Sequence, residues 1–133
     1  MIQYGSSDKP VHVLLAEDNL LLQEAIRIML SQRGFQVSLA KNIQDAVAKM
    51  KKQDFDLLLM AIQKSVPGAV DATREIRQFN IYTPIIAFTS HDDTKMLPLI
   101  KEAGMNGFLS KYASPEHICD TLLQHAHSVK RYS

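Results

Sequence analysis

The stretch that decides the fold is Asp56-Leu57-Leu58-Leu59-Met60-Ala61-Ile62-Gln63, near the middle of the chain. Its apolar residues follow one another without polar alternation, which is typical of a parallel strand covered by helices on both faces. We expect this strand to span residues 55–60 and a loop to run from Ala61 to Pro67. Ligands bind beyond the carboxyl ends of parallel strands, and at this end the chain has only the methyl group of Ala61.

Shorter apolar runs on either side of this stretch alternate with segments of helical spacing. Further strands are predicted at residues 11–16, 35–40, 85–89 and 107–110, and helices at 20–33, 43–52, 69–79, 93–103 and 115–128. Such alternation predicts a parallel sheet with helices on both faces and right-handed crossovers. One domain over residues 10–128 follows, with a flexible lead-in at 1–9 and a tail at 129–133.

The predicted helices carry recognisable end signals. Asn19, Asn42 and Ser114 each precede a helix as N-cap residues, and Asp92 or Asp93 fills that place before the fourth helix. Gly34 and Gly104 end the first and fourth helices in the position that favours glycine. Pro98 is tolerated only near the first turn of its helix, and Pro115 suits the first position of the last one.

The composition excludes several classes of protein. Apolar residues make up 46% and charged residues 22%, as in an ordinary globular domain. The net charge of +1 gives no bulk attraction to nucleic acid or to an anionic membrane, so neither is expected as a partner. A single cysteine, Cys119, excludes an internal disulfide and fits the reducing cytoplasm, where we expect the protein to be.

Polar side chains stand where the predicted strands end. Glu17 and Asp18 follow the first strand, Thr89 ends the fourth and Ser90 follows it, and Lys111 follows the fifth. Adjacent carboxylates suit Mg²⁺, which prefers a few carboxylates together with waters and phosphate oxygens. An ammonium group can neutralise phosphate charge, and a hydroxyl can donate a hydrogen bond to a phosphoryl oxygen. The pattern indicates a site for a phosphoryl group on a carboxylate.

Four segments in this order resemble the landmarks of the response-regulator receiver domain of two-component and phosphorelay signalling. They are Leu14–Asn19, Asp56–Ala61, Pro84–Ser90 and Gly107–Lys111. The resemblance covers residues 10–128. It implies a (βα)5 flavodoxin-like fold, a doubly wound parallel five-stranded sheet, in which a histidine kinase transfers a phosphoryl group to an aspartate at the end of the third strand.

The resemblance also implies roles for single residues. Glu17 and Asp18 match the acidic pair that binds Mg²⁺, while Thr89, with Ser90 beside it, matches the hydroxyl position and Lys111 the lysine of the phosphoryl pocket. Phe108 matches the aromatic residue that moves between outward and inward positions in switching, and an ordinary core aromatic is the alternative. Ala61 occupies the position of the phosphoacceptor aspartate.

Three features depart from the family pattern. Ala61 cannot accept a phosphoryl group and removes one Mg²⁺ ligand. The loop after it reads Lys64-Ser65-Val66-Pro67-Gly68-Ala69, in which the family's usual proline, acid and glycine are displaced or lost. Tyr112 stands where the family usually has a proline after a cis bond. A trans bond is expected here, because a cis bond before a non-proline residue costs about 3 kcal/mol.

These departures change what the site is expected to do. With two carboxylates left, we expect Mg²⁺ to bind weakly or not at all and no cofactor to be required. Lys111 is then expected to pair with one carboxylate as a structural counter-ion. Lys64 is either a surface lysine or a cation that folds into the acid pocket. Asp56, at the far end of its strand, and Asp71, on the following helix, do not replace the acceptor.

Three functions are weighed from the sequence. The first is a degenerate receiver, not an enzyme, that contacts a protein partner through residues 93–103, Phe108 and the last helix. The partner would be a sensor kinase, an output domain or a downstream protein. The second is an ordinary phosphoacceptor receiver in which an introduced Asp→Ala change blocks position 61. The third is a flavodoxin-like cofactor binder, which Glu17 and Asp18 disfavour because they repel a flavin phosphate.

Overall fold

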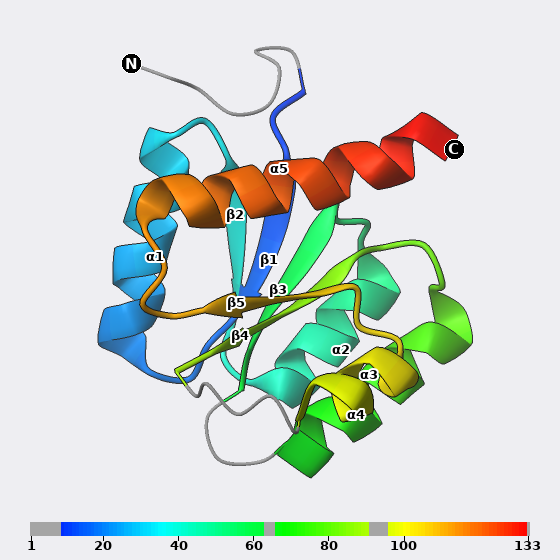
Figure 1. The fold of residues 1–133 in the computed structure, drawn as a ribbon. Coiled ribbons are helices and arrows are strands. Elements are labelled where there is room, and N and C mark those ends of the chain that lie inside the picture. The colour runs from blue at the N-terminus through cyan, green and yellow to red at the C-terminus, as the bar shows by residue number, and fades with distance from the viewer. Residues whose placement is uncertain (1–8, 63–65, 91–95, 133) are drawn as a thin grey trace.

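The fold was analysed in a computed structural model that describes residues 9–62, 66–90 and 96–132, without the side chains of residues 66 and 127–132. Strands and helices alternate along the described chain (Figure 1). In order they are β1 (His12–Ala16), α1 (Leu20–Gln32), β2 (Gln36–Ala40), α2 (Ile43–Lys52), β3 (Leu57–Ile62), α3 (Val66–Phe79), β4 (Ile85–Thr89), α4 (Leu97–Ala103), β5 (Gly107–Ser110) and α5 (Pro115–Tyr132). No helix in the described ranges has the length and apolar character of a membrane span.

The strands form one sheet in the order β2-β1-β3-β4-β5, and every neighbouring pair is parallel. Helices α1 and α5 cover one face, and α2, α3 and α4 cover the other (Figure 1). The predicted (βα)5 doubly wound sheet is therefore confirmed. Strand order reverses between β1 and β3, so the edge beyond their carboxyl ends is where a site is expected in such a sheet.

Strand β3 is the centre of the sheet, and all six of its residues are buried. Leu58 and Met60 pack with α2, α3 and α4, whereas Leu57 and Leu59 pack with α1 and α5. The alternation follows from the two-residue period of a strand, which sends successive side chains to opposite faces. Each leucine thus joins one of two cores, and truncation of such a residue to alanine costs about 2–5 kcal/mol.

The predicted helix caps that fall in the described residues are confirmed. The side chains of Asn19, Asn42 and Ser114 accept hydrogen bonds from the backbone N–H groups of Leu22, Asp45 and His117. Gly34 and Gly104 adopt φ angles of 92° and 113°, which disfavour residues with a Cβ atom. Pro98 lies in the first turn of α4. The caps predicted at Asp92 or Asp93 lie outside the described residues.

Three predicted boundaries are wrong. Strand β3 runs from Leu57 to Ile62, so Ala61 belongs to the strand and not to a loop. It extends because β4 pairs with it as far as Ile62. Helix α3 begins at Val66, with Pro67 in its first turn, where the missing N–H leaves no hydrogen bond unmade. Helix α5 continues to Tyr132, because neither glycine nor proline interrupts it, so residues 129–132 lengthen the helix instead of forming a tail.

Candidate functional site at the carboxyl edge of the sheet

Parallel pairing brings the predicted site residues to one edge of the sheet. Ala16, the last residue of β1, is level with Met60 in β3, and Ile62 is level with Thr89 in β4. Thr89 is in turn level with Ser110 at the end of β5. Glu17, Ala61 and Lys111 each lie within one residue of these positions, so residues distant in the sequence converge there.

Glu17 and Lys111 form a buried ion pair at this edge. The Lys111 Nζ atom lies 3.5 Å from Glu17 Oε2, and the side chains of Lys111 and Glu17 are only 7% and 1% exposed. The same ammonium lies 5.9 Å from the centre of the Phe88 ring, within the range of a cation–π contact. The predicted pairing of Lys111 with one of the two carboxylates is therefore present.

The environment of Glu17 favours its neutral form. Burial raises the pKa of this carboxyl group above its ordinary value, and the charge of Lys111, with the hydrogen bond that it donates, opposes the rise. The neighbouring Asp18 carboxylate adds to the rise. A carboxylate in this position depends on the ammonium of Lys111, because a buried charge requires a partner.

The two adjacent acids have different surroundings. Asp18 is exposed to solvent, whereas Glu17 is buried with Lys111. Among the residues that the structure describes, no three His, Cys, Asp or Glu side chains come together as a metal-binding group. The acids therefore do not form a closed set of ligands, and the expectation of a weak Mg²⁺ site stays a prediction.

The remaining pocket residues differ in accessibility. Ala61 is 9% exposed and Thr89 is fully buried, but Ser90 is exposed. Ala61 is level with Phe88 in the neighbouring strand. Ala61 is thus level with the residue whose aromatic ring the Lys111 ammonium approaches. Lys64 lies outside the described residues, so its two alternatives stay predictions.

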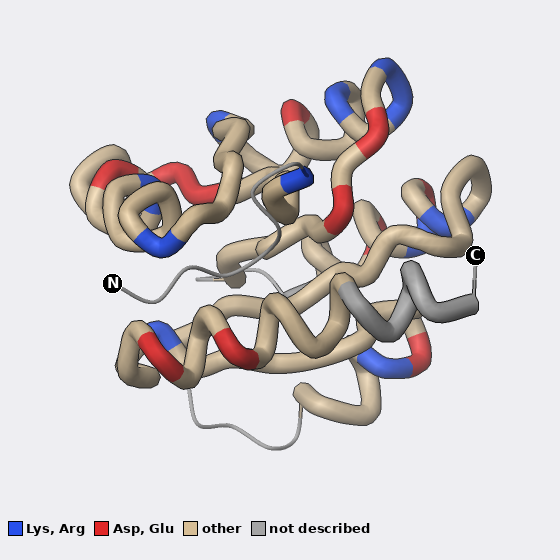
Figure 2. Tube along the Cα trace, turned by 90° about the horizontal axis from the view of Figure 1, so that it is seen from above, with Lys and Arg blue, Asp and Glu red and all other residues tan. Residues whose placement is uncertain are grey.

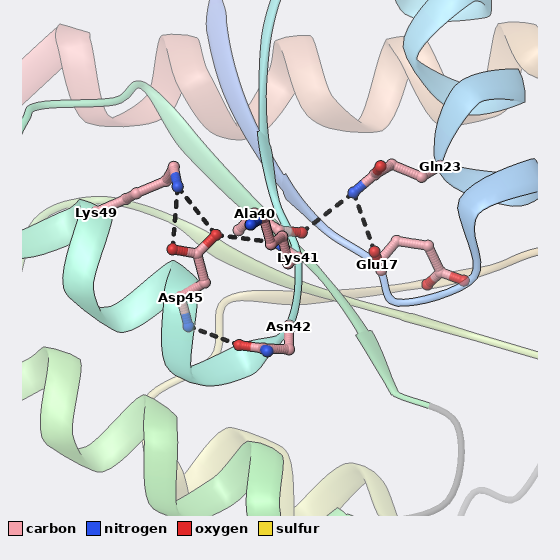
Figure 3. A network of polar contacts seen from close by, with 7 residues as sticks. All are labelled: Glu17, Gln23, Ala40, Lys41, Asn42, Asp45 and Lys49. Carbon is pink, nitrogen blue, oxygen red and sulfur yellow. Dashed lines mark hydrogen bonds and ion pairs between the residues drawn. The ribbon is translucent and has the colours of Figure 1, made fainter.

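Gln23 is a site residue that the sequence reasoning missed. Its Nε2 atom donates to the backbone carbonyl of Glu17 at 3.0 Å and to that of Ala40 at 3.2 Å (Figure 3). It thereby ties α1 to the ends of β1 and β2. Gln23 is buried, whereas Ala25 on the same helix is exposed. The spacing of Gln23 with Ile26 and Leu30, three and seven residues later, is the signal that could have revealed it.

The predicted partner surface is partly described. Residues 91–95 lie outside the described residues, and in α4 Ile100 and Ala103 are buried whereas Leu97 and Leu99 are exposed. Phe108 is partly buried and packs against the core on the α2, α3 and α4 side. Tyr112 is 82% exposed, and the bond before it is trans, since no cis peptide bond occurs in the described chain. A switching role for Phe108 stays a prediction.

The two other acids considered from the sequence lie away from this edge. Asp56 precedes β3, and its Oδ2 atom accepts a hydrogen bond of 2.8 Å from the backbone N–H of His12 at the start of β1. Asp71 is exposed on α3. Neither position is that of the acceptor, as predicted. Cys119 is fully buried, and burial raises the pKa of its thiol to about 11, so it acts as a core residue.

Comparison with known proteins shows which family the chain belongs to. A family model described as "Response regulator receiver domain" matches residues 13–123. Hybrid signal transduction histidine kinase I of Dictyostelium discoideum is 32% identical over 131 residues, which cover 89% of this chain and 7% of that kinase. The CAI-1 autoinducer sensor kinase/phosphatase of Vibrio cholerae is 35% identical over 106 residues, which cover 76% of this chain and 15% of that protein. The chain thus spans a small part of these relatives.

Solved structures agree in fold. The receiver domain of a sensor histidine kinase from Pseudomonas aeruginosa, with a magnesium ion coordinated in its active site cleft, has a TM-score of 0.80 and 30% identity, covering 90% of this chain and 99% of that one. A CheY-like receiver from Methanospirillum hungatei reaches a TM-score of 0.85 at 14% identity, covering 94% of this chain and all of that one, and shows the fold alone. The family match, the relatives and the five-stranded sheet lead to one conclusion: the chain belongs to the response regulator receiver domain family.

Proposed function

We propose that this receiver is a signalling module that accepts no phosphoryl group at the usual position and acts through contacts with other proteins. The observation that carries the proposal is the methyl group of Ala61 at the end of β3, beside the buried Glu17–Lys111 pair. An acyl phosphate forms when a carboxylate oxygen attacks phosphorus, and a methyl group has no electron pair to offer. The missing chemistry follows from the residue itself, so no rearrangement of the pocket supplies it.

The neighbouring oxygen atoms are poor substitutes for the missing carboxylate. Glu17 is buried, and its carboxylate is already paired with the Lys111 ammonium. Thr89 is a fully buried hydroxyl, which needs a general base before it can attack. Asp18 is exposed to water and follows β1, so its carboxylate does not stand at position 61 of β3. These features support a domain that does not catalyse its own phosphorylation.

The magnesium ion that the family implies does not fit this arrangement as a resident cofactor. Mg²⁺ is held by carboxylates with several waters and phosphate oxygens, and among the residues that the structure describes at this edge the carboxylates are those of Glu17 and Asp18. Lys111 already neutralises Glu17 at 3.5 Å. A divalent cation at Glu17 would have to displace that ammonium, so no step of the proposed function passes through a metal.

Contact with a protein partner is the role that this arrangement leaves. Leu97 and Leu99 present apolar side chains on α4, and Phe108 lies on the neighbouring strand β5. Matched relatives are a hybrid histidine kinase and a sensor kinase/phosphatase, so a kinase or another component of such a pathway is the class of partner that we propose. The regulating input would then reach the domain by a route other than phosphorylation of position 61.

The proposal is tested by offering the chain a small phosphodonor. Wild-type protein, Ala61→Asn and Ala61→Asp are incubated with acetyl phosphate and Mg²⁺, and intact-mass spectrometry measures covalent phosphate. We expect none on the wild type or on Ala61→Asn, which has a similar size to aspartate but no carboxylate. A phosphoryl group on any wild-type side chain would contradict the proposal.

The Ala61→Asp variant separates the two receiver hypotheses. A pocket that has degenerated as a whole stays unmodified, since Lys111 remains bound to Glu17 and the loop after β3 no longer has the family's residues. Rapid formation of an acyl phosphate, which hydroxylamine removes, would instead indicate an intact receiver that lacks only its acceptor. We expect the first result.

A further inference from the structure

A groove between α2 and α3 runs along the outer surface of the domain, from the first turns of both helices to Lys52 and Glu75. We call it the α2–α3 groove. It encloses about 490 Å³. Its apolar lining includes Ile43, Val47 and Ala72, of which Val47 and Ala72 are only 6% and 7% exposed. The groove thus combines an apolar floor with charged residues along its two rims.

The two rims of the α2–α3 groove carry opposite charges. Lys51 and Lys52 lie on the α2 side, and Asp71 and Glu75 lie on the α3 side. All four residues are exposed. Lys51 Nζ lies 3.7 Å from Glu75 Oε1, with about half of each side chain exposed, which shows that the basic and acidic groups stand at the same height along the groove. The α2 rim therefore presents positive charge directly across from negative charge.

This arrangement is complementary to itself. A two-fold axis that runs along the groove places the α2 rim of one copy against the α3 rim of the other, and the reverse contact follows by symmetry. Lys51 and Lys52 of each copy then face Asp71 and Glu75 of its partner. A foreign protein would need to match both rims independently, whereas a second copy matches them by symmetry alone.

The overall charge of the chain permits such self-association. The net charge is +1, so two copies repel one another very little. In Figure 2, basic and acidic positions are interspersed around the fold instead of gathered by sign. The existing Lys51–Glu75 pair is solvent-exposed, and exposed pairs contribute at most about 1 kcal/mol, so its side chains can reorganise across an interface at little cost.

We propose that the α2–α3 groove is the interface of a symmetric dimer of this chain, in which the lysine rim of each copy pairs with the acidic rim of the other. The inference goes beyond the proposed function and does not depend on phosphorylation. Residues 96–103, Phe108 and α5 lie outside the groove lining, so a dimer would leave that surface available to another protein.

Sedimentation equilibrium of the full chain at low and high salt tests the proposal. The wild type is expected to dimerise reversibly at low salt and to dissociate at high salt, because exposed charge pairs are screened by salt. Two charge-reversed variants follow: Lys51→Glu with Lys52→Glu, and Asp71→Lys with Glu75→Lys. Each alone faces like charges across the interface, so its dimerisation is expected to weaken at least about tenfold.

An equimolar mixture of the two charge-reversed variants is the decisive measurement. The all-acidic groove of one then faces the all-basic groove of the other, and a heterodimer at least as stable as the wild-type dimer is expected. Exposed residues elsewhere give matched controls: Lys41→Glu with Lys101→Glu, and Glu102→Lys with Asp120→Lys. Each control pair changes the net charge by the same amount as the matching groove variant. Because these residues lie outside the groove, the control variants are expected to dimerise as the wild type does.

Three results would overturn the proposal. A wild type that stays monomeric across the concentration range at low salt has no such interface. Dimerisation that persists in each charge-reversed variant uses another face of the domain. A mixture that fails to form heterodimers, although circular dichroism shows both variants folded, removes the pairing of the rims.

Discussion

Both edges of the sheet carry polar side chains, but these side chains have different kinds of partner at the two edges. At the carboxyl edge, the ammonium of Lys111 and the carboxylate of Glu17 neutralise each other, with side chains 7% and 1% exposed. At the amino edge, Asp56 accepts a hydrogen bond from the backbone N–H of His12, whose ring nitrogen Nε2 lies 2.7 Å from Ser38 Oγ. One edge depends on a charge pair, and the other on hydrogen bonds to backbone and neutral groups.

Arg77 shows how the amino edge accommodates a full charge. Its guanidinium group donates to the carbonyl oxygen of Gly104 at 2.9 and 3.0 Å, to that of Asn80 at 3.0 Å and to Asn106 Oδ1 at 2.8 Å. Asn106 Oδ1 also accepts from the backbone N–H of Ile85. These acceptors join the end of α3, the end of α4 and the start of β4. The hydrogen bonds of the Arg77 guanidinium group thus hold these three segments together.

The polar contacts at the two edges differ in what they contribute to the fold. Bonds from side chain to backbone at the amino edge fix the ends of strands and helices, and any similar fold needs them. A buried ion pair contributes little net stability over an apolar replacement, so the fold alone gives no reason for Glu17 and Lys111. Both residues stand at the carboxyl edge, which is where a site is expected in a doubly wound sheet.

The largest effect is expected when the pair at the carboxyl edge is broken. Lys111→Met keeps an apolar stem but leaves the Glu17 carboxylate buried without the ammonium, and the free energy of unfolding at pH 7 should fall by about 3 kcal/mol. Urea denaturation measures the change, and Lys101→Met on the exposed surface of α4 is the control. A loss no larger than that of the control would show that Lys111 is not a structural counter-ion. Adding Glu17→Gln to Lys111→Met should restore part of the loss.

A smaller loss is expected at the amino edge. Arg77→Met removes the donors to Gly104, Asn80 and Asn106 while keeping most of the side-chain volume, so the free energy of unfolding should fall by about 2 kcal/mol. Arg74→Met, an exposed position on the same helix, provides the matched control. Hydrogen exchange should also quicken at the end of α4. If the loss exceeds that of Lys111→Met, the contrast between the edges is reversed.

The smallest effects are expected from pH, and they have opposite signs at the two edges. Burial raises the pKa of Glu17, so its favourable contribution in acid is lost as the pH rises above about 4.3. Burial lowers the pKa of His12, with Asp56 opposing, so its favourable contribution at neutral pH is lost as the pH falls below about 6.5.

Two single variants isolate these titrations. Relative to Glu17→Gln, the free energy of unfolding of the wild type should fall as the pH rises above about 4.3, the ordinary pKa of a glutamate side chain. Relative to His12→Gln, the free energy of unfolding of the wild type should fall as the pH falls from about 7 to 5, the range in which histidine titrates. Urea denaturation at each pH gives both differences. If the free energy of unfolding varies with pH equally in a variant and in the wild type, folding does not change the pKa of that group.

Much of the fold could be predicted because its signals are local. The spacing of apolar residues separates strands from helices, and Asn19, Asn42 and Ser114 cap helices through bonds to residues three positions later. The boundaries of β3 could not be predicted this way. Ala61 and Ile62 join the strand because β4 supplies partners for them, and those partners lie 27 residues further along the chain.

The candidate site likewise has features that the sequence predicts and features that it does not. The parallel direction of the strands, which the sequence predicts, places Glu17, Ala61, Thr89 and Lys111 at one edge. Which of the two acids pairs with Lys111, 94 residues away from Glu17, depends on which one the folded chain buries. Gln23 was missed for a related reason, since its hydrogen-bond acceptors are backbone carbonyl groups, which have no signature in the sequence.

The sequence alone establishes that the side chain at position 61 is a methyl group, and no fold can add a carboxylate to it. It also determined the succession of strands and helices, since their periods are local. Only the tertiary structure decided that Glu17 and not Asp18 is buried against Lys111, and that Gln23 and Arg77 bridge separate elements. Burial and long-range hydrogen bonds arise when distant segments meet and exclude water.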